Sequence, residues 1–189
     1  MKLSTDKHKV LYSEKKIKAR VKELAEQISK DYEGKKPYMI VVLKGAVIFA
    51  SDLLRALTIP CEIDFIGISS YGQGSRSTGI VRITKDLDES IESKHVLVVE
   101  DIVDSGQTLN YLLNTLRQRR PASIKVVSFL DRPDRREVDV CIDYTGFNIP
   151  DAFVLGYGMD YRELYRRVPY VFVLEHLPNG DDLLLKSMQ

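Results

Sequence analysis

The chain has 189 residues, which is enough to bury a substantial hydrophobic core without disulfides. Hydrophobic residues make up 44% of it and charged residues 29%, and 28 basic against 27 acidic side chains leave a formal net charge of +1. This balance excludes an extended disordered chain and a protein that coats nucleic acid by charge alone. The polar start lacks the apolar core of a signal peptide, two cysteines are too few for a disulfide scaffold, and the apolar runs are far shorter than the ~20 residues that span a bilayer. We therefore expect a soluble, cytoplasmic protein that forms one domain over residues 1–189.

The hydrophobic pattern alternates along the chain between helical and strand spacing. Residues 13–32 place Ile17, Val21, Leu24 and Ile28 on one face, which predicts an amphipathic helix. Continuous β-branched runs predict strands that are covered on both faces. In chain order the expected elements are a helix over 13–32, a strand over 39–43, a helix over 46–57, strands over 61–69, 80–84 and 96–99, a helix over 105–119, a strand over 124–130, and short strands near 152–155 and 170–174. Repeated strand-turn-helix-strand units predict an α/β fold with a mostly parallel sheet.

Three acidic residues and a glycine-containing turn stand between a buried strand and a helix, in the stretch Val98 to Leu109. Ligands of open α/β sheets bind at such places, beyond the carboxyl end of a strand. The amides and hydroxyls of residues 105–108 suit a phosphate monoester at a helix N-terminus, and the adjacent Glu100 and Asp101 suit vicinal sugar hydroxyls. The stretch therefore predicts a sugar-phosphate site. The alternative is that Asp104 or Ser105 merely caps the helix.

Other motifs for phosphate binding and catalysis do not occur in the sequence. It contains neither G-x-x-x-x-G-K-[ST] nor G-x-S-x-G. His8, His95 and His176 lie far apart and show no zinc-ligand spacing with the cysteines. We expect ordinary surface or core roles for the histidines.

Five segments carry a resemblance to a known family. They are Leu43-Lys-Gly45, Ser70-Tyr71, Val98 to Leu109, Leu130-Asp-Arg-Pro133 and Gly146 to Tyr161. The third resembles the phosphoribosyl-pyrophosphate signature of type I phosphoribosyltransferases, and the last is similar to the hypoxanthine and guanine branch of that family. The resemblance runs from about Ser13 to Leu174. It implies a mostly parallel sheet flanked by helices, with a small hood region and a flexible lid over about residues 69–84.

The resemblance also implies an activity in purine salvage. Enzymes of that branch transfer phosphoribose from 5-phosphoribosyl 1-pyrophosphate to hypoxanthine or guanine, which gives IMP or GMP and releases pyrophosphate. Mg²⁺ is the implied cofactor, and a homodimer or homotetramer is the implied assembly. We expect neither a membrane nor a nucleic acid as a partner.

Roles for individual residues follow from the resemblance. Those expected to act in catalysis are Asp104, as the general base that takes the proton from purine N7, with Lys44 and Arg166. Those expected to bind the ribose and its 5′-phosphate are Glu100, Asp101, Asp104, Ser105, Gly106, Gln107 and Thr108. Those expected at the pyrophosphate are Lys44, Gly45 and Arg166, those at the purine are Arg132, Phe153, Val154 and Asp160, and those in the lid are Ser70 and Tyr71. The implied metal ligands are Glu100, Asp101 and Asp160.

Three positions depart from the pattern of the family. Arg132 stands where most relatives have a lysine for the purine O6, which leaves the base preference open. Gln107 replaces a lysine that some relatives carry in the phosphate loop, and Ala46 replaces a small residue such as glycine or serine. A preference for xanthine is therefore one alternative to the hypoxanthine and guanine activity.

A second alternative is a regulator that shares the fold and binds nucleotide and RNA. Three groups of arginines motivate it because such groups bind nucleic-acid phosphates. The groups are Arg117, Arg119 and Arg120; Arg132, Arg135 and Arg136; and Arg162, Arg166 and Arg167. Two of the groups contain positions that the enzyme hypothesis already uses, and the presence of Asp104 favours catalysis.

Overall fold

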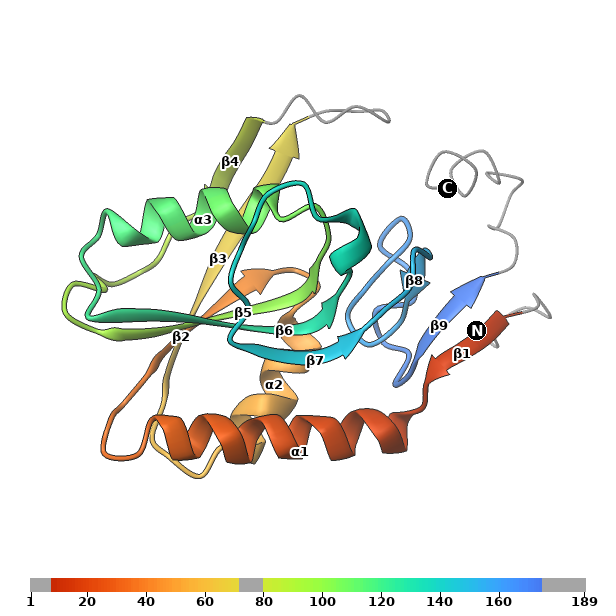
Figure 1. Cartoon of the computed structure of the whole chain (residues 1–189), viewed down its shortest axis with the longest axis horizontal. Helices are drawn as coiled ribbons and strands as arrows, with labels where there is room; N and C mark the ends of the chain where they lie inside the picture. Colours follow the sequence, from red (N-terminus) through yellow and green to blue (C-terminus); the bar gives the residue numbers. More distant parts are fainter. Residues whose placement is uncertain (1–7, 72–79, 175–189) are drawn as a thin grey trace.

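The computed structural model describes residues 8–71 and 80–174, and a six-stranded sheet forms its centre (Figure 1). The strands of this sheet are β2 (Tyr38–Leu43), β3 (Glu62–Tyr71), β4 (Ile80–Lys85), β5 (His95–Val103), β6 (Ser123–Asp131) and β7 (Tyr144–Asn148), in the order β4-β3-β2-β5-β6-β7. All neighbours pair in parallel except β3 and β4, which form an antiparallel edge. The α/β class and the mostly parallel sheet predicted from the sequence are confirmed.

Helices cover both faces of this sheet (Figure 1). The helices α1 (Glu14–Asp31) and α2 (Val47–Ala56) pack on one face, and α3 (Gln107–Arg117) packs on the other. The apolar stripe of α1 is buried as predicted, and its N-cap Ser13 accepts a hydrogen bond of 3.4 Å from the Lys16 amide. A short 3₁₀ helix, η1 (Pro133–Arg135), follows β6. None of the described helices is long and apolar enough to cross a membrane.

A second, three-stranded antiparallel sheet lies beyond the carboxyl ends of β5, β6 and β7 (Figure 1). It consists of β1 (His8–Tyr12), β9 (Val171–Leu174) and β8 (Val154–Leu155), with β9 in the centre. The sequence predicted β8 and β9 but missed β1 and β7. Both are short, and β7 contains Gly146, where a Cβ atom would lie 2.3 Å from the carbonyl oxygen of Phe129. That close approach of two backbones explains a glycine in a strand.

The direction of strand succession reverses between β2 and β5. The chain leaves β2 through α2 to β3 on one side, and leaves β5 through α3 to β6 on the other. A crevice forms at such a switch point, outside the carboxyl ends of the two strands, and ligands of α/β proteins bind there. One expectation needs correction here, because β5 runs on to Val103 and not only to Val99. Glu100 and Asp101 therefore belong to the strand rather than to the turn, and Glu100 pairs in register with Ser128 of β6.

Candidate active site

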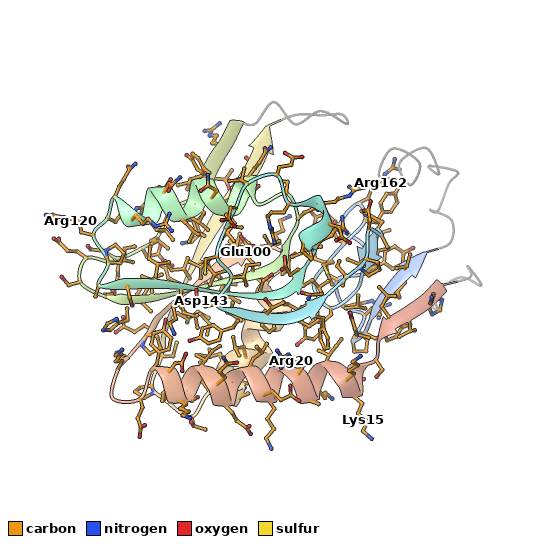
Figure 2. All side chains as sticks on the ribbon, viewed as in Figure 1. Lys15, Arg20, Glu100, Arg120, Asp143 and Arg162 are labelled. Atoms are coloured by element: carbon orange, nitrogen blue, oxygen red, sulfur yellow. The ribbon has the colours of Figure 1, made fainter. Side chains whose placement is uncertain are left out.

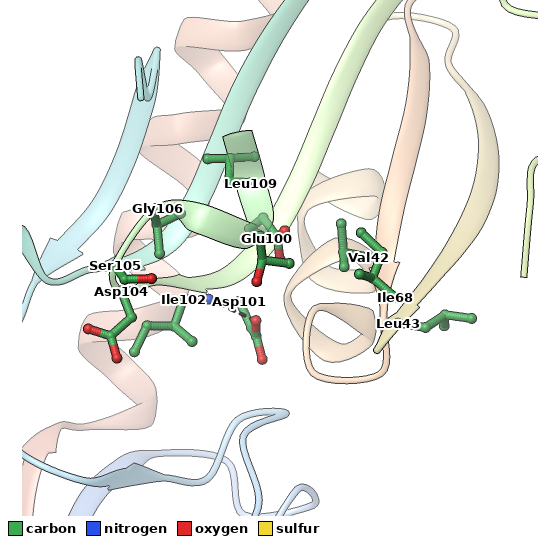
Figure 3. Close-up of a pocket in the computed structure, with 12 residues that line it drawn as sticks. Val42, Leu43, Ile68, Glu100, Asp101, Ile102, Asp104, Ser105, Gly106 and Leu109 are labelled. Atoms are coloured by element: carbon green, nitrogen blue, oxygen red, sulfur yellow. Dashed lines mark hydrogen bonds between the residues drawn. The ribbon is translucent and has the colours of Figure 1, made fainter. Parts of the chain in front are cut away.

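A cavity of about 230 Å³ lies at the switch point between β2 and β5 (Figure 3). Its lining consists of Val42, Leu43, Ile68, Glu100, Asp101, Ile102, Val103, Asp104, Ser105, Gly106, Thr108 and Leu109. The structure thus brings together every residue predicted for ribose and 5′-phosphate except Gln107. The side chain of Gln107 turns away and donates to the carboxylate of Glu137.

The loop from Ser105 to Gly106 leads into the N-terminus of α3. Gly106 is the N-cap of α3 and has a φ of +84°, in the left-handed region that favours glycine. A Cβ atom there would lie 2.6 Å from the carbonyl oxygen of Val138. The amides of Glu137 and Val138 donate to the Ser105 carbonyl over 2.9 and 3.1 Å, which fixes the loop from outside. The Gln107 amide donates to Oγ of Ser105 over 3.4 Å, and the first amides of an α-helix have no acceptor within the helix, which makes a helix N-terminus suited to an anion.

Glu100 is buried and Asp101 is partly buried. Glu100 is only 6% exposed, and Figure 2 shows it between the sheet and α3, whereas Lys15 and Arg120 lie at the periphery. Burial and the neighbouring Asp101 both raise the pKa of Glu100 well above its ordinary value. Burial also raises the pKa of Asp101, although its carboxylate accepts a 2.8 Å hydrogen bond from the Ile102 amide. Two adjacent carboxyl groups of this kind suit hydroxyl donors or a cation.

Asp104 is paired with the buried Arg132. Nη1 of Arg132 lies 3.2 Å from Oδ2 of Asp104, and Nη2 donates to the Ala152 carbonyl over 2.5 Å. Arg132 is 3% exposed, so this arginine is fixed by its surroundings. Oδ1 of Asp104 and Nε of Arg132 are buried without a partner among the described residues. Buried polar atoms are nearly always satisfied, so an unpartnered acceptor and an unpartnered donor on two paired side chains set this pair apart from the other ion pairs.

Arg136 holds the backbone of this aspartate. Its Nη1 donates to the Asp104 carbonyl over 2.8 Å, and its Nη2 pairs with Asp131 at the end of β6. From the sequence alone, Arg136 is only one of the possible nucleic-acid contacts. No sequence signal marks its role, because the contact joins residues that are 32 positions apart.

Lys44 and Gly45 follow β2 at the same edge of the sheet, with a cis peptide bond between Leu43 and Lys44. A Cβ atom on Gly45 would lie 1.6 Å from Oδ2 of Asp101, and one on Gly158 would lie 2.0 Å from the Gly45 carbonyl oxygen. Both glycines therefore permit a close approach of three chain segments. Lys44 itself is outside the cavity lining, and its Nζ lies 2.9 Å from Oε1 of Glu163.

Arg166 joins the same region from the segment after β8. Its Nη1 donates to the Gly158 carbonyl over 2.7 Å, and its Nη2 lies 2.7 Å from Oδ1 of Asp160. Glu163 contacts Arg166 at 3.3 Å as well as Lys44, so one carboxylate connects the two cations predicted for pyrophosphate. The hydrogen bond from Lys44 lowers the pKa of Glu163. Sequence reasoning did not select Glu163, and its contact with Lys44 spans 119 residues.

The residues predicted for the purine, which are Arg132, Phe153, Val154 and Asp160, lie outside the lining of the cavity. Phe153 is half-buried and meets the Tyr161 ring edge-on, with 6.3 Å between ring centroids, and Val154 is buried in β8. Neither residue lines the 230 Å³ cavity.

The residues predicted for the lid, Ser70 and Tyr71, end β3, where their backbones pair with Val81 and Ile80. Residues 72–79, the centre of the expected lid, lie outside the described residues.

A metal ion would need ligands from its substrate. Across residues 8–71 and 80–174, no group of three or more histidine, cysteine, aspartate or glutamate side chains could hold an ion. The predicted ligands Glu100, Asp101 and Asp160 therefore do not form a cage by themselves. Mg²⁺, however, is usually bound through one or two carboxylates, waters and substrate phosphates. Glu100 and Asp101, which are adjacent in β5, line the same cavity and have raised pKa values, fit that requirement.

Known proteins of similar sequence and structure point to one family. The family model of the phosphoribosyl transferase domain matches residues 8–162. The hypoxanthine-guanine phosphoribosyltransferase of Bacillus subtilis is 48% identical over 170 residues, covering 90% of this chain and 94% of the relative. The hypoxanthine phosphoribosyltransferase of Buchnera aphidicola is 50% identical over 165 residues, covering 86% and 93%. A crystal structure of a hypoxanthine phosphoribosyltransferase from Staphylococcus aureus superposes with a TM-score of 0.85 at 46% identity, covering 88% of this chain and 91% of that one.

A mostly parallel sheet with this cavity at its switch point, together with the family match over residues 8–162, defines the class. The chain belongs to the phosphoribosyltransferase family of enzymes and has its type I fold. Within that family it groups with the hypoxanthine-guanine phosphoribosyltransferases.

Proposed function

We propose that the protein transfers phosphoribose from 5-phosphoribosyl 1-pyrophosphate to hypoxanthine and guanine, as the names of its relatives indicate for those proteins. The observation that carries this proposal is the arrangement around Asp104. Asp104 and its ion-pair partner Arg132 each carry a buried polar atom without a partner among the described residues, and Asp104 lines the same cavity as Glu100, Asp101 and the N-terminus of α3. A 6-oxopurine would bind to the unpartnered acceptor and donor, and a ribose 5-phosphate would bind to the helix N-terminus and the two acids.

The donor would lie along the end of β5. The 5′-phosphate accepts hydrogen bonds from the loop amides of residues 105–108, at the positive end of the α3 dipole. Glu100 and Asp101 accept from the ribose hydroxyls. The diphosphate then points toward Lys44 and Arg166, the cations beyond Asp101 and Gly45. These residues would fix the anomeric carbon of the donor next to Asp104.

Asp104 would act as the general base. As purine N9 forms a bond to the anomeric carbon, the bond from that carbon to the pyrophosphate oxygen breaks, and the oxygen keeps the electron pair. The proton on purine N7 then passes to Asp104, whose Oδ1 is free to accept it. Positive charge that develops on the ribose is stabilised by the nearby carboxylates, and negative charge on the leaving group by Lys44 and Arg166.

Arg132 would bind the purine O6. Its unpartnered Nε–H offers a donor to a carbonyl oxygen, while its two terminal nitrogens stay on Asp104 and Ala152. A 6-oxopurine supplies such an acceptor, and a 6-aminopurine does not. Phe153 would stack on the ring, and the Val154 backbone would contact the N1 edge, with Asp160 beside it. The cofactor in this proposal is Mg²⁺, which would be held by Glu100 and Asp101, with Asp160 near the diphosphate, and would neutralise phosphate charge.

The RNA-binding alternative loses its main support in the structure. Many of the arginines that motivated it are paired with acids. Arg119, for example, forms a bidentate pair with Asp86 at 2.8 and 2.9 Å. Arginines held in this way are not an open surface for phosphates.

A product assay tests the proposal. The purified protein is incubated with 5-phosphoribosyl 1-pyrophosphate and Mg²⁺ against hypoxanthine, guanine, xanthine, adenine and uracil, and nucleotides are separated by chromatography. We expect IMP and GMP, none from adenine or uracil, and loss of product in excess chelator. Product from xanthine in preference to both expected bases would support the xanthine alternative. Binding of RNA without nucleotide formation from any base would refute the enzyme assignment.

A further inference from the structure

The carboxylate of Glu163 lies between two cationic side chains. Its Oε1 lies 2.9 Å from Nζ of Lys44, and its Oε2 lies 3.3 Å from Nη2 of Arg166. One carboxylate therefore connects the residue that follows β2 with the segment that follows β8. Lys44 and Arg166 are the two side chains that the proposed function assigns to pyrophosphate.

A strained turn places this carboxylate. Arg162 and Glu163 have φ values of +50° and +64°, and the backbones of Tyr161 and Leu164 bond to each other on either side of them, at 2.9 and 3.2 Å. Turns with two positive φ values favour asparagine and glycine, so a glutamate here is conformationally unfavourable. The Glu163 amide donates to Oδ2 of Asp160 over 2.7 Å, which helps to hold the turn. The turn thus fixes a carboxylate at a position where the backbone alone would favour a smaller residue.

The two cations depend on Glu163 to different degrees. Arg166 keeps its contacts with Asp160 and with the Gly158 carbonyl when Glu163 is removed. Lys44 has Glu163 as its one ion-pair partner within the described residues. Loss of Glu163 would therefore leave Arg166 in place and free the ammonium group of Lys44.

We propose that Glu163 is an internal counter-ion that occupies the pyrophosphate position in the ligand-free protein and is displaced when a diphosphate binds. This inference rests on the proposed function, since it takes Lys44 and Arg166 as the pyrophosphate cations. A carboxylate resembles one end of a phosphate in charge and in its two oxygens, so the same donors can bind either one. The glutamate thus competes with the diphosphate of the donor and with the pyrophosphate product.

The competition is expected to be modest. Side chains of Lys44 and Glu163 are 66% and 63% exposed, and exposed ion pairs are weak and easily exchanged. Removing the carboxylate should therefore tighten pyrophosphate binding by about two- to fivefold, which corresponds to the usual strength of such a pair. The gain should shrink at high salt, because salt screens exposed charges.

Calorimetric titration of the whole protein with inorganic pyrophosphate and Mg²⁺ tests the proposal. Glu163→Gln should lower the dissociation constant about two- to fivefold. Glu163→Gly also removes the carboxylate, and glycine suits the φ of +64°. This variant should lower the dissociation constant of pyrophosphate by at least the same factor. Glu89→Gln is a matched control, because Glu89 is 68% exposed and lies 2.9 Å from Lys94, far from the site. It should leave pyrophosphate binding unchanged.

Kinetics separate competition from a structural effect. Glu163→Gln should lower the KM for 5-phosphoribosyl 1-pyrophosphate by the same factor and leave the KM for hypoxanthine unchanged. Unchanged or weaker pyrophosphate binding in both Glu163 variants would overturn the proposal, as would an equal gain in Glu89→Gln. Failure of the proposed function gives a different result: the wild-type protein forms no nucleotide, while the binding series still decides the role of Glu163.

Discussion

Replacement of Glu100 by glutamine should stabilise the ligand-free protein while weakening its proposed function. Glu100 is 6% exposed, and burial and Asp101 both raise its pKa. The glutamate is protonated in both the folded and the unfolded state below the ordinary pKa of about 4.3, so wild type and Glu100→Gln should be equally stable there. As pH rises from that ordinary pKa toward the raised pKa, the unfolded state ionises while the folded state still holds its proton, so the wild type loses stability. The amide of the variant does not ionise.

The size of the effect follows from the cost of an uncompensated buried group, about 1–3 kcal/mol. For a protein of this length, each kcal/mol corresponds to about 2–4 °C in Tm. Thermal unfolding of both proteins from pH 4 to pH 8 should therefore show a difference that is near zero at the acidic end and grows to at least about 2 °C at the other. Binding of 5-phosphoribosyl 1-pyrophosphate should weaken about tenfold or more, because a hydrogen bond to a charged group is lost.

Glu33→Gln is the control for this experiment, because Glu33 is exposed on the turn after α1. It should not change the pH dependence of Tm. A variant Glu100→Gln that is less stable than wild type at pH 8, or that differs from it equally at all pH values, would refute the reasoning about buried charge.

Three further substitutions test other parts of the account. Gly106→Ala should lower the free energy of unfolding by at least about 1–2 kcal/mol in urea denaturation, because φ is +84° and Val138 blocks the new Cβ; an unchanged midpoint would contradict this. Tyr157→Phe should cost about 0.5–1.5 kcal/mol in the same assay, since the buried hydroxyl loses its 2.7 Å bond to Asp52; a neutral result would show that the bond contributes nothing. Arg132→Lys should change the ratio of KM values for guanine and hypoxanthine but not the KM of the donor; identical ratios would exclude Arg132 from base recognition.

The sheet and the turn before α3 were predictable because their signals are local. Continuous apolar strands, the helical stripe of α1 and the Asp-Ser-Gly turn each depend on neighbouring residues, and the structure has each at the expected place. The end of β5 was not predictable from the sequence, because backbone pairing with β6 extends the strand through Glu100 and Asp101 in spite of their charge. Short strands such as β1 form only through long-range pairing, here with β9.

The parts of the site that the sequence did not predict are contacts between distant segments of the chain. Glu163 reaches Lys44, Arg136 holds Asp104, and Gly158 approaches Gly45, and none of these pairs leaves a local pattern. The resemblance named one partner in each pair, because it supplies motifs rather than distances. Arg132 shows the opposite case: the sequence marked it as a departure, and the structure shows how its longer side chain is accommodated between Asp104 and Ala152.

In the proposed reaction, Asp104 takes the purine proton in this cavity. Asp104→Asn tests this step most directly, because the amide keeps the shape of the side chain but cannot accept the proton. With hypoxanthine as substrate, turnover should fall by a factor of about 10² or more, while the dissociation constant of 5-phosphoribosyl 1-pyrophosphate changes little. Turnover equal to that of the wild type would contradict the account.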